Sequence, residues 1–194
     1  MARRDLREAI LEAALRLSAQ DGFDTLSTAE VCRAAGASNG SMFHHFPTKA
    51  ALGAALYLRT LEHYQDAIAA SLEGARTARD GIRGLVLTHV RWVLAHPVEA
   101  RLLHERRRSG QAPDGEVDAR NRAFLARISA WLRPHLEAGR VRGWPPDVLV
   151  AVLFGPVHAL TRGWMRGEPA RRLEAAAPHL ADAAWAALAA PARR

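Results

Sequence analysis

The sequence predicts an all-α protein, and three observations lead to this conclusion. The 194 residues are 49% hydrophobic but only 6% aromatic, and alanine and leucine, which favour helices over strands, dominate the apolar part. Apolar residues recur at helical spacing along the chain. Neither an alternating strand pattern nor an internal repeat is found.

The first helix is expected over residues 4–20, where Leu6, Ile10 and Leu17 share one face. Gly22 is expected to end this helix, because glycine adopts the left-handed backbone conformation without strain. Phe23 can then fold back onto the helix.

A second, short helix is expected after a capping box. Ser27 and Glu30 have the required spacing, in which the serine hydroxyl accepts the amide of Glu30 and the carboxylate reaches back to the serine amide. Gly36 interrupts the helical pattern after two to three turns, so it marks a tight turn.

Two more helices are expected to follow directly. Ser38 is a second potential cap, and it begins a short helix over residues 39–46. Pro47 ends this helix, and Thr48 caps a fourth one that continues toward Leu72.

Turn signals divide the rest of the chain into five further helices. These are expected roughly over residues 79–94, 98–108, 116–138, 145–166 and 170–188. His96-Pro97 and a polar loop at 109–115 separate the first three of them. We expect Pro134 to kink its helix and Gly155-Pro156 to disturb the long apolar one.

Several classes of protein are excluded at this stage. Cys32 is the only cysteine, so neither an intramolecular disulfide nor a cysteine zinc cluster is possible. The longest apolar run, residues 148–161, is shorter than the ~20 residues of a membrane span. Acidic residues precede any apolar stretch in residues 1–8, unlike a secretory signal. We therefore expect a soluble cytoplasmic protein with no membrane association.

The distribution of charge points to an anionic partner without locating it. The formal net charge is +7, from 27 Lys and Arg against 20 Asp and Glu. Residues 31–61 contain no acidic residue, although Arg33, Lys49 and Arg59 lie among them. Much of the surplus lies at residues 101–142, where a solvated helix face is the simplest explanation.

Two short helices joined by a glycine turn, with a longer helix in front, indicate a helix-turn-helix. Met42 and Phe46 share a face of the second short helix and are expected to pack on Val31 and the first helix. The opposite face carries Asn39, Gly40, Phe43 and His44. Asparagine can pair with adenine, and glycine allows close approach of the backbone, so this face suits the major groove.

Three stretches of this region carry a family resemblance: Gly22-Phe23, residues 27–31 (STAEV) and residues 35–49 (AGASNGSMFHHFPTK). Together they resemble the amino-terminal domain of the TetR (tetracycline-repressor-like) transcriptional regulators. The resemblance implies a nine-helix, two-domain architecture, with a DNA-binding domain at residues 1–48 and a ligand-binding and dimerisation domain at residues 49–194. It also implies a dimer formed through the last two helices.

The resemblance assigns DNA contacts residue by residue. It implies phosphate contacts from Thr28, Ser41, His45 and Lys49, and base contacts from Ala29, Asn39, Gly40 and Phe43. Ser38 and His44 complete the expected DNA-contacting set. Two positions depart from the family. The family commonly has tyrosine where Phe43 stands, so one hydroxyl contact to DNA is missing here. It commonly has another aromatic residue where His44 stands.

No metal, cofactor or catalytic residue is predicted. Neighbouring His44 and His45 point about 100° apart on a helix and cannot easily share an ion. His104-Glu105 begins a zinc-peptidase motif, but Arg108 stands where its second histidine is needed. Cys32 is interpreted as a core residue, with a redox switch as the alternative.

The resemblance implies a ligand pocket and a dimer interface in the later helices. Candidate effector-binding residues are His89, Trp92, His96, Trp131, Phe154 and His158, and for each an ordinary core or surface role is the alternative. Candidate dimer-interface residues are Val152, Leu160, Trp164, Leu180, Ala184, Trp185 and Leu188.

The resulting hypothesis is a homodimeric repressor that binds a near-palindromic double-stranded operator and is released by a small-molecule effector. One alternative is an all-α small-molecule-binding protein or enzyme without DNA-binding activity. The acid-free stretch at residues 31–61 argues against it. A basic protein lying on membranes is a further alternative, but the arginines are dispersed rather than gathered on one amphipathic helix.

Overall fold

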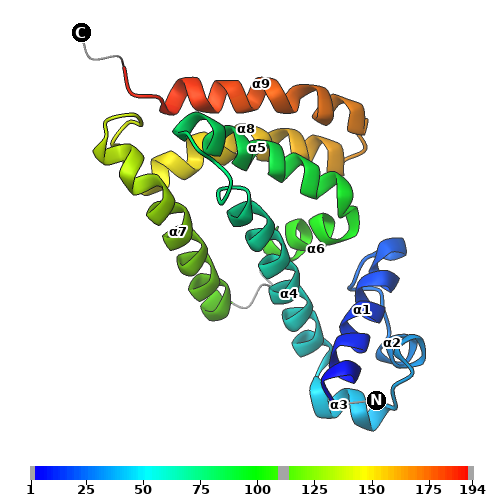
Figure 1. Cartoon of the computed structure of the whole chain (residues 1–194). Coiled ribbons are helices and arrows are strands. Elements are labelled where there is room, and N and C mark those ends of the chain that lie inside the picture. Colours follow the sequence, from blue (N-terminus) through cyan, green and yellow to red (C-terminus); the bar gives the residue numbers. More distant parts are fainter. Residues whose placement is uncertain (1–2, 109–113, 192–194) are drawn as a thin grey trace. The chain divides into compact units, whose positions relative to one another are not determined.

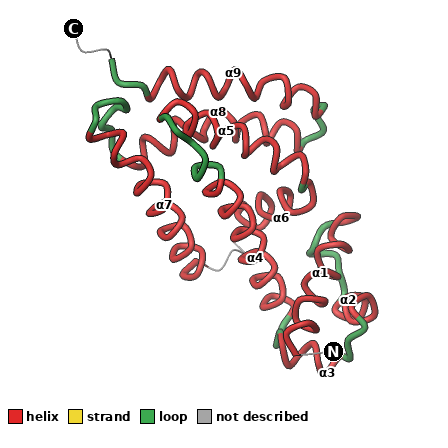
Figure 2. The backbone as a smooth tube through the Cα atoms, viewed as in Figure 1, coloured by secondary structure: helices red, strands yellow, loops and turns green. Residues whose placement is uncertain are grey.

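Helices make up the fold throughout the described part of the chain (Figure 1). The computed structural model describes residues 3–108 and 114–191. The helices are α1 (Arg3–Asp21), α2 (Thr28–Ala35), α3 (Asn39–His45), α4 (Lys49–Ala70), α5 (Ala78–Ala95), α6 (Pro97–Arg108), α7 (Asp114–Glu137), α8 (Pro146–Met165) and α9 (Ala170–Leu188). Within these residues, the β-structure is limited to an isolated bridge between Val141 and Ala189, and Figure 2 shows only helices and loops. The all-α prediction and the order of its helices are confirmed; most of the predicted loop at 109–115, and the first two residues, lie outside the described part.

Both ends of α2 are formed by the local interactions that the sequence predicts. The Ser27 amide donates to Glu30 Oε2 at 2.8 Å, and the Glu30 amide donates to Ser27 Oγ at 3.2 Å, which completes the predicted capping box. The Ser27 hydroxyl also donates to Glu30 Oε2, at 2.6 Å, and this bond together with the one from the Ser27 amide holds the pKa of the Glu30 carboxyl below its ordinary value. Gly36 ends α2 with φ of 65°, in the left-handed region where glycine alone is unstrained.

The chain divides into two compact units, which are described separately. Unit 1 comprises Met1–His63 and His96–Asp118, and unit 2 comprises Tyr64–Ala95 and Ala119–Arg194. α4 and α7 each contribute one part to each unit. These units are defined by packing. The predicted division into a DNA-binding domain (residues 1–48) and a ligand-binding and dimerisation domain (residues 49–194) is defined by function and stays a prediction.

The core of unit 1 fixes the orientation of α3. Met42 and Phe46 are 0% and 2% exposed and belong to one apolar cluster with Val31 and α1, as predicted. Cys32 is buried in the same cluster, with its Sγ 3.4 Å from Met42 Sδ. Burying a large apolar side chain contributes about 1.5–3 kcal/mol, so rotating α3 about its axis would be costly.

Unit 2 is built around α5, α8 and α9, with α9 packed along both of the others (Figure 1). The interior is apolar and includes Ile82, Val86 and Leu153. Trp131 of α7 fits so closely against α5 that a Cβ at Gly81 would overlap its indole ring. Glycine at this position therefore permits the contact.

α8 matches the helix predicted over residues 145–166 to within one residue at each end. It runs unbroken for 20 residues through Gly155 and Pro156, so the expected disturbance does not end it. Its length and composition would suffice to cross a membrane. However, Leu149, Leu153 and Val157 are buried, so one face of α8 packs on α5 and α9 within unit 2.

Candidate nucleic-acid interface

α3 presents its polar face to solvent. Asn39, Gly40, Phe43 and His44 are all exposed, whereas Met42 and Phe46 are buried. Phe43 is 46% exposed, which is unusual for a large apolar side chain, and it is not part of the core. An exposed aromatic ring on a short, firmly anchored helix is available for contact with another molecule.

The N-terminus of α3 is held by two serines. Ser38 Oγ accepts the Ser41 amide at 3.1 Å and lies 2.8 Å from Ser41 Oγ. Ser38 is therefore the N-cap, as predicted, and its hydroxyl already has a role inside the protein. The caps fix the start of α3, so Asn39 and Gly40 occupy defined positions.

The first residues of α2 and α4, the helices before and after α3, belong to the same candidate interface. Thr28 and Ala29 begin α2, where amide groups point outward and favour an anion. Lys49 begins α4; its ammonium donates to the Asp24 carbonyl oxygen and lies 5.7 Å from the centre of the Phe23 ring. An ammonium has three donors, so this bond leaves capacity for a phosphate oxygen.

The C-terminal end of α3 gathers further positive or titratable groups. The rings of His44 and His45 lie 5.5 Å apart in an edge-to-face arrangement. The Arg7 guanidinium of α1 lies 5.3 Å from the centre of the Phe46 ring. Arg7 was not predicted for this site, because its proximity to α3 depends on how α1 packs and leaves no local pattern.

A buried polar cluster in unit 2 contains three of the predicted effector residues. His89 Nδ1 lies 2.8 Å from the Tyr64 hydroxyl, and His89 Nε2 lies 3.0 Å from Thr161 Oγ1. The His89 ring also contacts those of Phe154 and His158, at centroid distances of 6.4 and 4.9 Å. This set, the His89 cluster, joins α4, α5 and α8.

The hydrogen bonds assign the protons of this cluster. Thr161 donates its hydroxyl hydrogen to the Val157 carbonyl at 2.9 Å, so it accepts from His89 Nε2–H. His89 Nδ1 then accepts from Tyr64. Burial, aided by the neighbouring His158, lowers the pKa of His89 to about 3, and burial raises the pKa of Tyr64 above its ordinary value. All three groups are therefore neutral near pH 7.

The remaining predicted effector residues lie elsewhere or at the margin. Trp92 is buried with its ring 5.0 Å from that of Tyr64, so it borders the His89 cluster. Trp131 packs on Gly81 and on the His135 ring, at a centroid distance of 4.7 Å. His96 belongs to unit 1. Tyr64 and Thr161 were missed, because long-range packing alone brings them to His89.

The predicted dimer residues divide by exposure. The half-buried ones retain surface for a partner; they are Val152, Leu160, Trp164, Leu180 and Trp185. Ala184 and Leu188 are buried within unit 2 and pack in the chain's own interior. The surface that α8 and α9 could offer is therefore formed by the half-buried set.

The chain is similar in sequence to bacterial transcriptional regulators. Residues 10–56 match the family model described as bacterial regulatory proteins, tetR family. The HTH-type transcriptional regulator AcrR of Shigella flexneri is 31% identical over 104 residues, which are 54% of this chain and 45% of that protein. The match thus spans less than half the length of that relative.

Solved structures extend the similarity to the whole chain. A tetR family protein from Shewanella sp. PV-4 has a TM-score of 0.76 at 28% identity, covering 96% of this chain and 99% of that one. A TetR family transcription regulator from Marinobacter aquaeolei VT8 has the same fold, with a TM-score of 0.75 at 23% identity and 97% coverage of both chains. The sequence match over the helix-turn-helix and the fold shared along the chain agree: residues 10–56 carry the helix-turn-helix region of the tetR family of bacterial regulatory proteins, and nearly the whole chain shares the fold of solved TetR family structures.

Proposed function

We propose that this protein is a DNA-binding transcriptional repressor that binds a near-palindromic double-stranded operator as a homodimer. The observation that carries the proposal is α3, whose apolar face is buried at Met42 and Phe46 while Asn39, Gly40 and Phe43 are exposed. A helix anchored in this way can enter the major groove without losing its own packing. Residues 1–48 form the DNA-binding domain in this proposal, and residues 49–194 the regulatory one.

The proposed DNA contacts fall into two groups. Ala29, Asn39, Gly40 and Phe43 meet base edges, and Thr28, Ser41, His45 and Lys49 meet phosphates. Phe43 contributes apolar contact only, because it has no hydroxyl. Ser38 and His44 border these groups and complete the surface.

The proposed dimer uses the last two helices. α8 and α9 carry half-buried apolar side chains at Leu160, Trp164 and Leu180. Pairing these helices with a second copy would bury them in a four-helix bundle with twofold symmetry. The same symmetry would place two copies of α3 on the two halves of a palindrome.

The proposed effector site is the His89 cluster. Its aromatic rings and neutral hydrogen-bonding groups match the composition of small-molecule sites. Because His89 is neutral, an uncharged ligand with one polar group fits this chemistry better than an anion. Such a ligand releases DNA only to the extent that it binds the DNA-free state more tightly.

A protein without DNA-binding activity is the less supported alternative. It would leave an exposed Phe43 and an acid-free surface over residues 31–61 without a role. The proposal assigns a catalytic role to no residue, and it places the protein with the DNA in the cytoplasm.

A mobility-shift assay with DNA from upstream of the protein's own or an adjacent gene tests the proposal. We expect retardation that survives excess nonspecific DNA and is weakened by Asn39→Ala. Ser129→Ala, an exposed change on α7 in unit 2, is the matched control and should bind normally. Binding that nonspecific DNA abolishes, or that Asn39→Ala leaves intact on every fragment, would contradict the proposal.

A further inference from the structure

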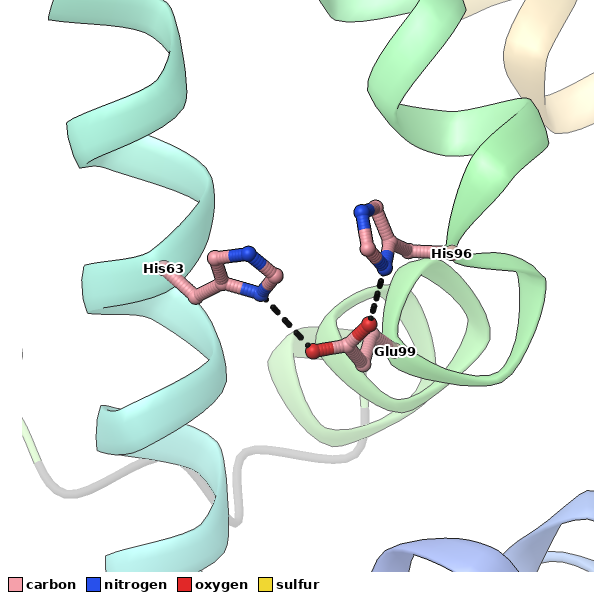
Figure 3. A group of neighbouring side chains, drawn as sticks. All are labelled: His63, His96 and Glu99. Carbon is pink, nitrogen blue, oxygen red and sulfur yellow. Dashed lines mark hydrogen bonds and ion pairs between the residues drawn. The ribbon is translucent and has the colours of Figure 1, made fainter.

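Three side chains that could ligate a metal converge in unit 1 (Figure 3). His63 lies on α4, His96 directly precedes α6, and Glu99 lies in the first turn of α6. His63 Nδ1 is 3.0 Å from Glu99 Oε1, and His96 Nδ1 is 2.7 Å from Glu99 Oε2. The two imidazole rings lie edge to face, with their centroids 4.8 Å apart.

The backbone holds two of these residues in place. The Ala100 amide donates to the His96 carbonyl at 2.9 Å, so His96 starts the helix in which Glu99 occupies the first turn. The Glu99 side chain is only 14% exposed, whereas His96 and His63 are 35% and 50% exposed. The carboxylate is therefore largely shielded from solvent, whereas solvent reaches both imidazoles.

We propose that His63, His96 and Glu99 form a site for a divalent transition-metal ion, with Zn²⁺ as the representative. All three ligand atoms lie within 4.8 Å of one another. A tetrahedral zinc ion with bonds of about 2.0–2.1 Å separates its ligand atoms by roughly 3.3 Å. Small side-chain rotations would bring the three atoms to these distances.

The donor set selects the kind of ion. Two imidazole nitrogens and one carboxylate oxygen suit zinc, and also nickel, cobalt and copper. Calcium and magnesium prefer sites made of oxygen atoms alone, so they fit poorly. Three protein ligands leave one position of a tetrahedron for water, which agrees with the exposure of His63 on the outer side.

An ion at this site would connect two segments far apart in the sequence. Within unit 1 it would join α4 to the beginning of α6, in addition to the contacts present without it. Because the unfolded chain holds no preformed set of these ligands, the ion would stabilise the folded state by mass action.

The competing explanation is a metal-free hydrogen-bonded cluster, in which Glu99 accepts an N–H from each ring. The two explanations differ in which ring nitrogen carries the proton. A metal at Nδ1 requires the proton at Nε2, whereas a bond from Nδ1 to Glu99 requires it at Nδ1. Metal titration therefore separates them directly.

Co²⁺ and Zn²⁺ titrations of the full, tag-free protein after chelator treatment test the site, without DNA. We expect one ion per chain, visible as the d–d absorption of Co²⁺ displaced by Zn²⁺, and a melting temperature that rises with Zn²⁺. His63→Ala and His96→Ala should each weaken binding at least about tenfold. Glu99→Gln, which retains hydrogen-bonding capacity but loses the charge, should weaken it as well.

His179→Ala, which removes an exposed histidine of α9, is the matched control and should bind as the unaltered protein does. His63 is half exposed, so its variant is expected to fold, and circular dichroism checks this. No binding at micromolar Zn²⁺, or binding that the double variant His63→Ala, His96→Ala retains, would overturn the proposal. Neither result would bear on DNA binding, which is measured separately.

Discussion

The surface of unit 1 that we propose binds DNA and the His89 cluster of unit 2 are built in opposite ways. The first is formed by residues 28–49, its caps join residues three apart, and its proposed contact residues are exposed or half-buried. The second joins Tyr64, His89 and Thr161 from three helices and is buried. One surface therefore depends on local helix signals and on a buried anchor, and the other depends on long-range packing and on protonation.

Removing the anchor of α3 should give the largest effect. Met42→Ala should lower the free energy of unfolding by about 2–5 kcal/mol, because Met42 is 0% exposed and a cavity would replace it. Phe43→Ala, one residue away, is the control: it should change stability by less than about 0.5 kcal/mol while weakening operator binding. Denaturant unfolding and a mobility shift measure the two effects. Equal stability losses for both variants would contradict the description of α3.

Acidification should affect the His89 cluster next most strongly. Burial lowers the pKa of His89 to about 3, and an unfolded histidine titrates near 6.5. Below pH 6.5 the unfolded state therefore binds more protons, so stability is lost as pH falls. Between pH 7 and 5 this group should remove about 2 kcal/mol.

The control for this pH effect is His89→Gln. This variant should lose less stability between pH 7 and 5, because it has no imidazole to protonate, although it should be less stable than the unaltered protein at pH 7. Urea unfolding at several pH values measures both proteins. An identical pH dependence in both would show that His89 is not buried in its neutral form.

Removing a proposed base contact should give the third largest effect. Asn39→Ala should weaken operator binding by about 1–3 kcal/mol and relax the preference at one base pair, because a bidentate pairing with adenine would be lost. Binding to a set of single-base operator variants measures this. If the preference stays the same at every position, α3 does not read bases through Asn39.

The smallest effect should come from Lys49. Lys49→Ala should reduce the slope of binding against salt concentration by about one per protomer, without altering sequence preference. Arg127→Ala, which removes a surface ion pair with Asp66 in unit 2, should leave the slope unchanged. A slope that Lys49→Ala does not alter would argue against a phosphate contact.

The same contrast explains what the sequence could predict. The capping box at Ser27 and Glu30, the turn at Gly36 and the buried face of α3 were all predictable, because each rests on residues a few positions apart. The helix bounds followed from periodicity and proline or glycine signals for the same reason. The candidate DNA-contacting residues were selected from this well-determined region, and their contacts remain predictions.

Long-range neighbours could not be predicted in this way. Nothing near His89 in the sequence points to Tyr64 or Thr161, and nothing near Glu99 points to His63. Likewise, the division of α4 between two units depends on which segments pack together, which helical periodicity does not reveal. In both cases the missing information is tertiary contact rather than local preference.

The contact between Gly81 and Trp131 constrains how this sequence can diverge. The indole of α7 occupies the space that any side chain on α5 at position 81 would need. Related proteins with this helix arrangement should therefore change the two positions together, pairing a larger residue at 81 with a smaller one at 131. Covariation of positions 81 and 131 among related sequences would therefore be evidence that α5 and α7 pack in this way, independent of any measurement of stability.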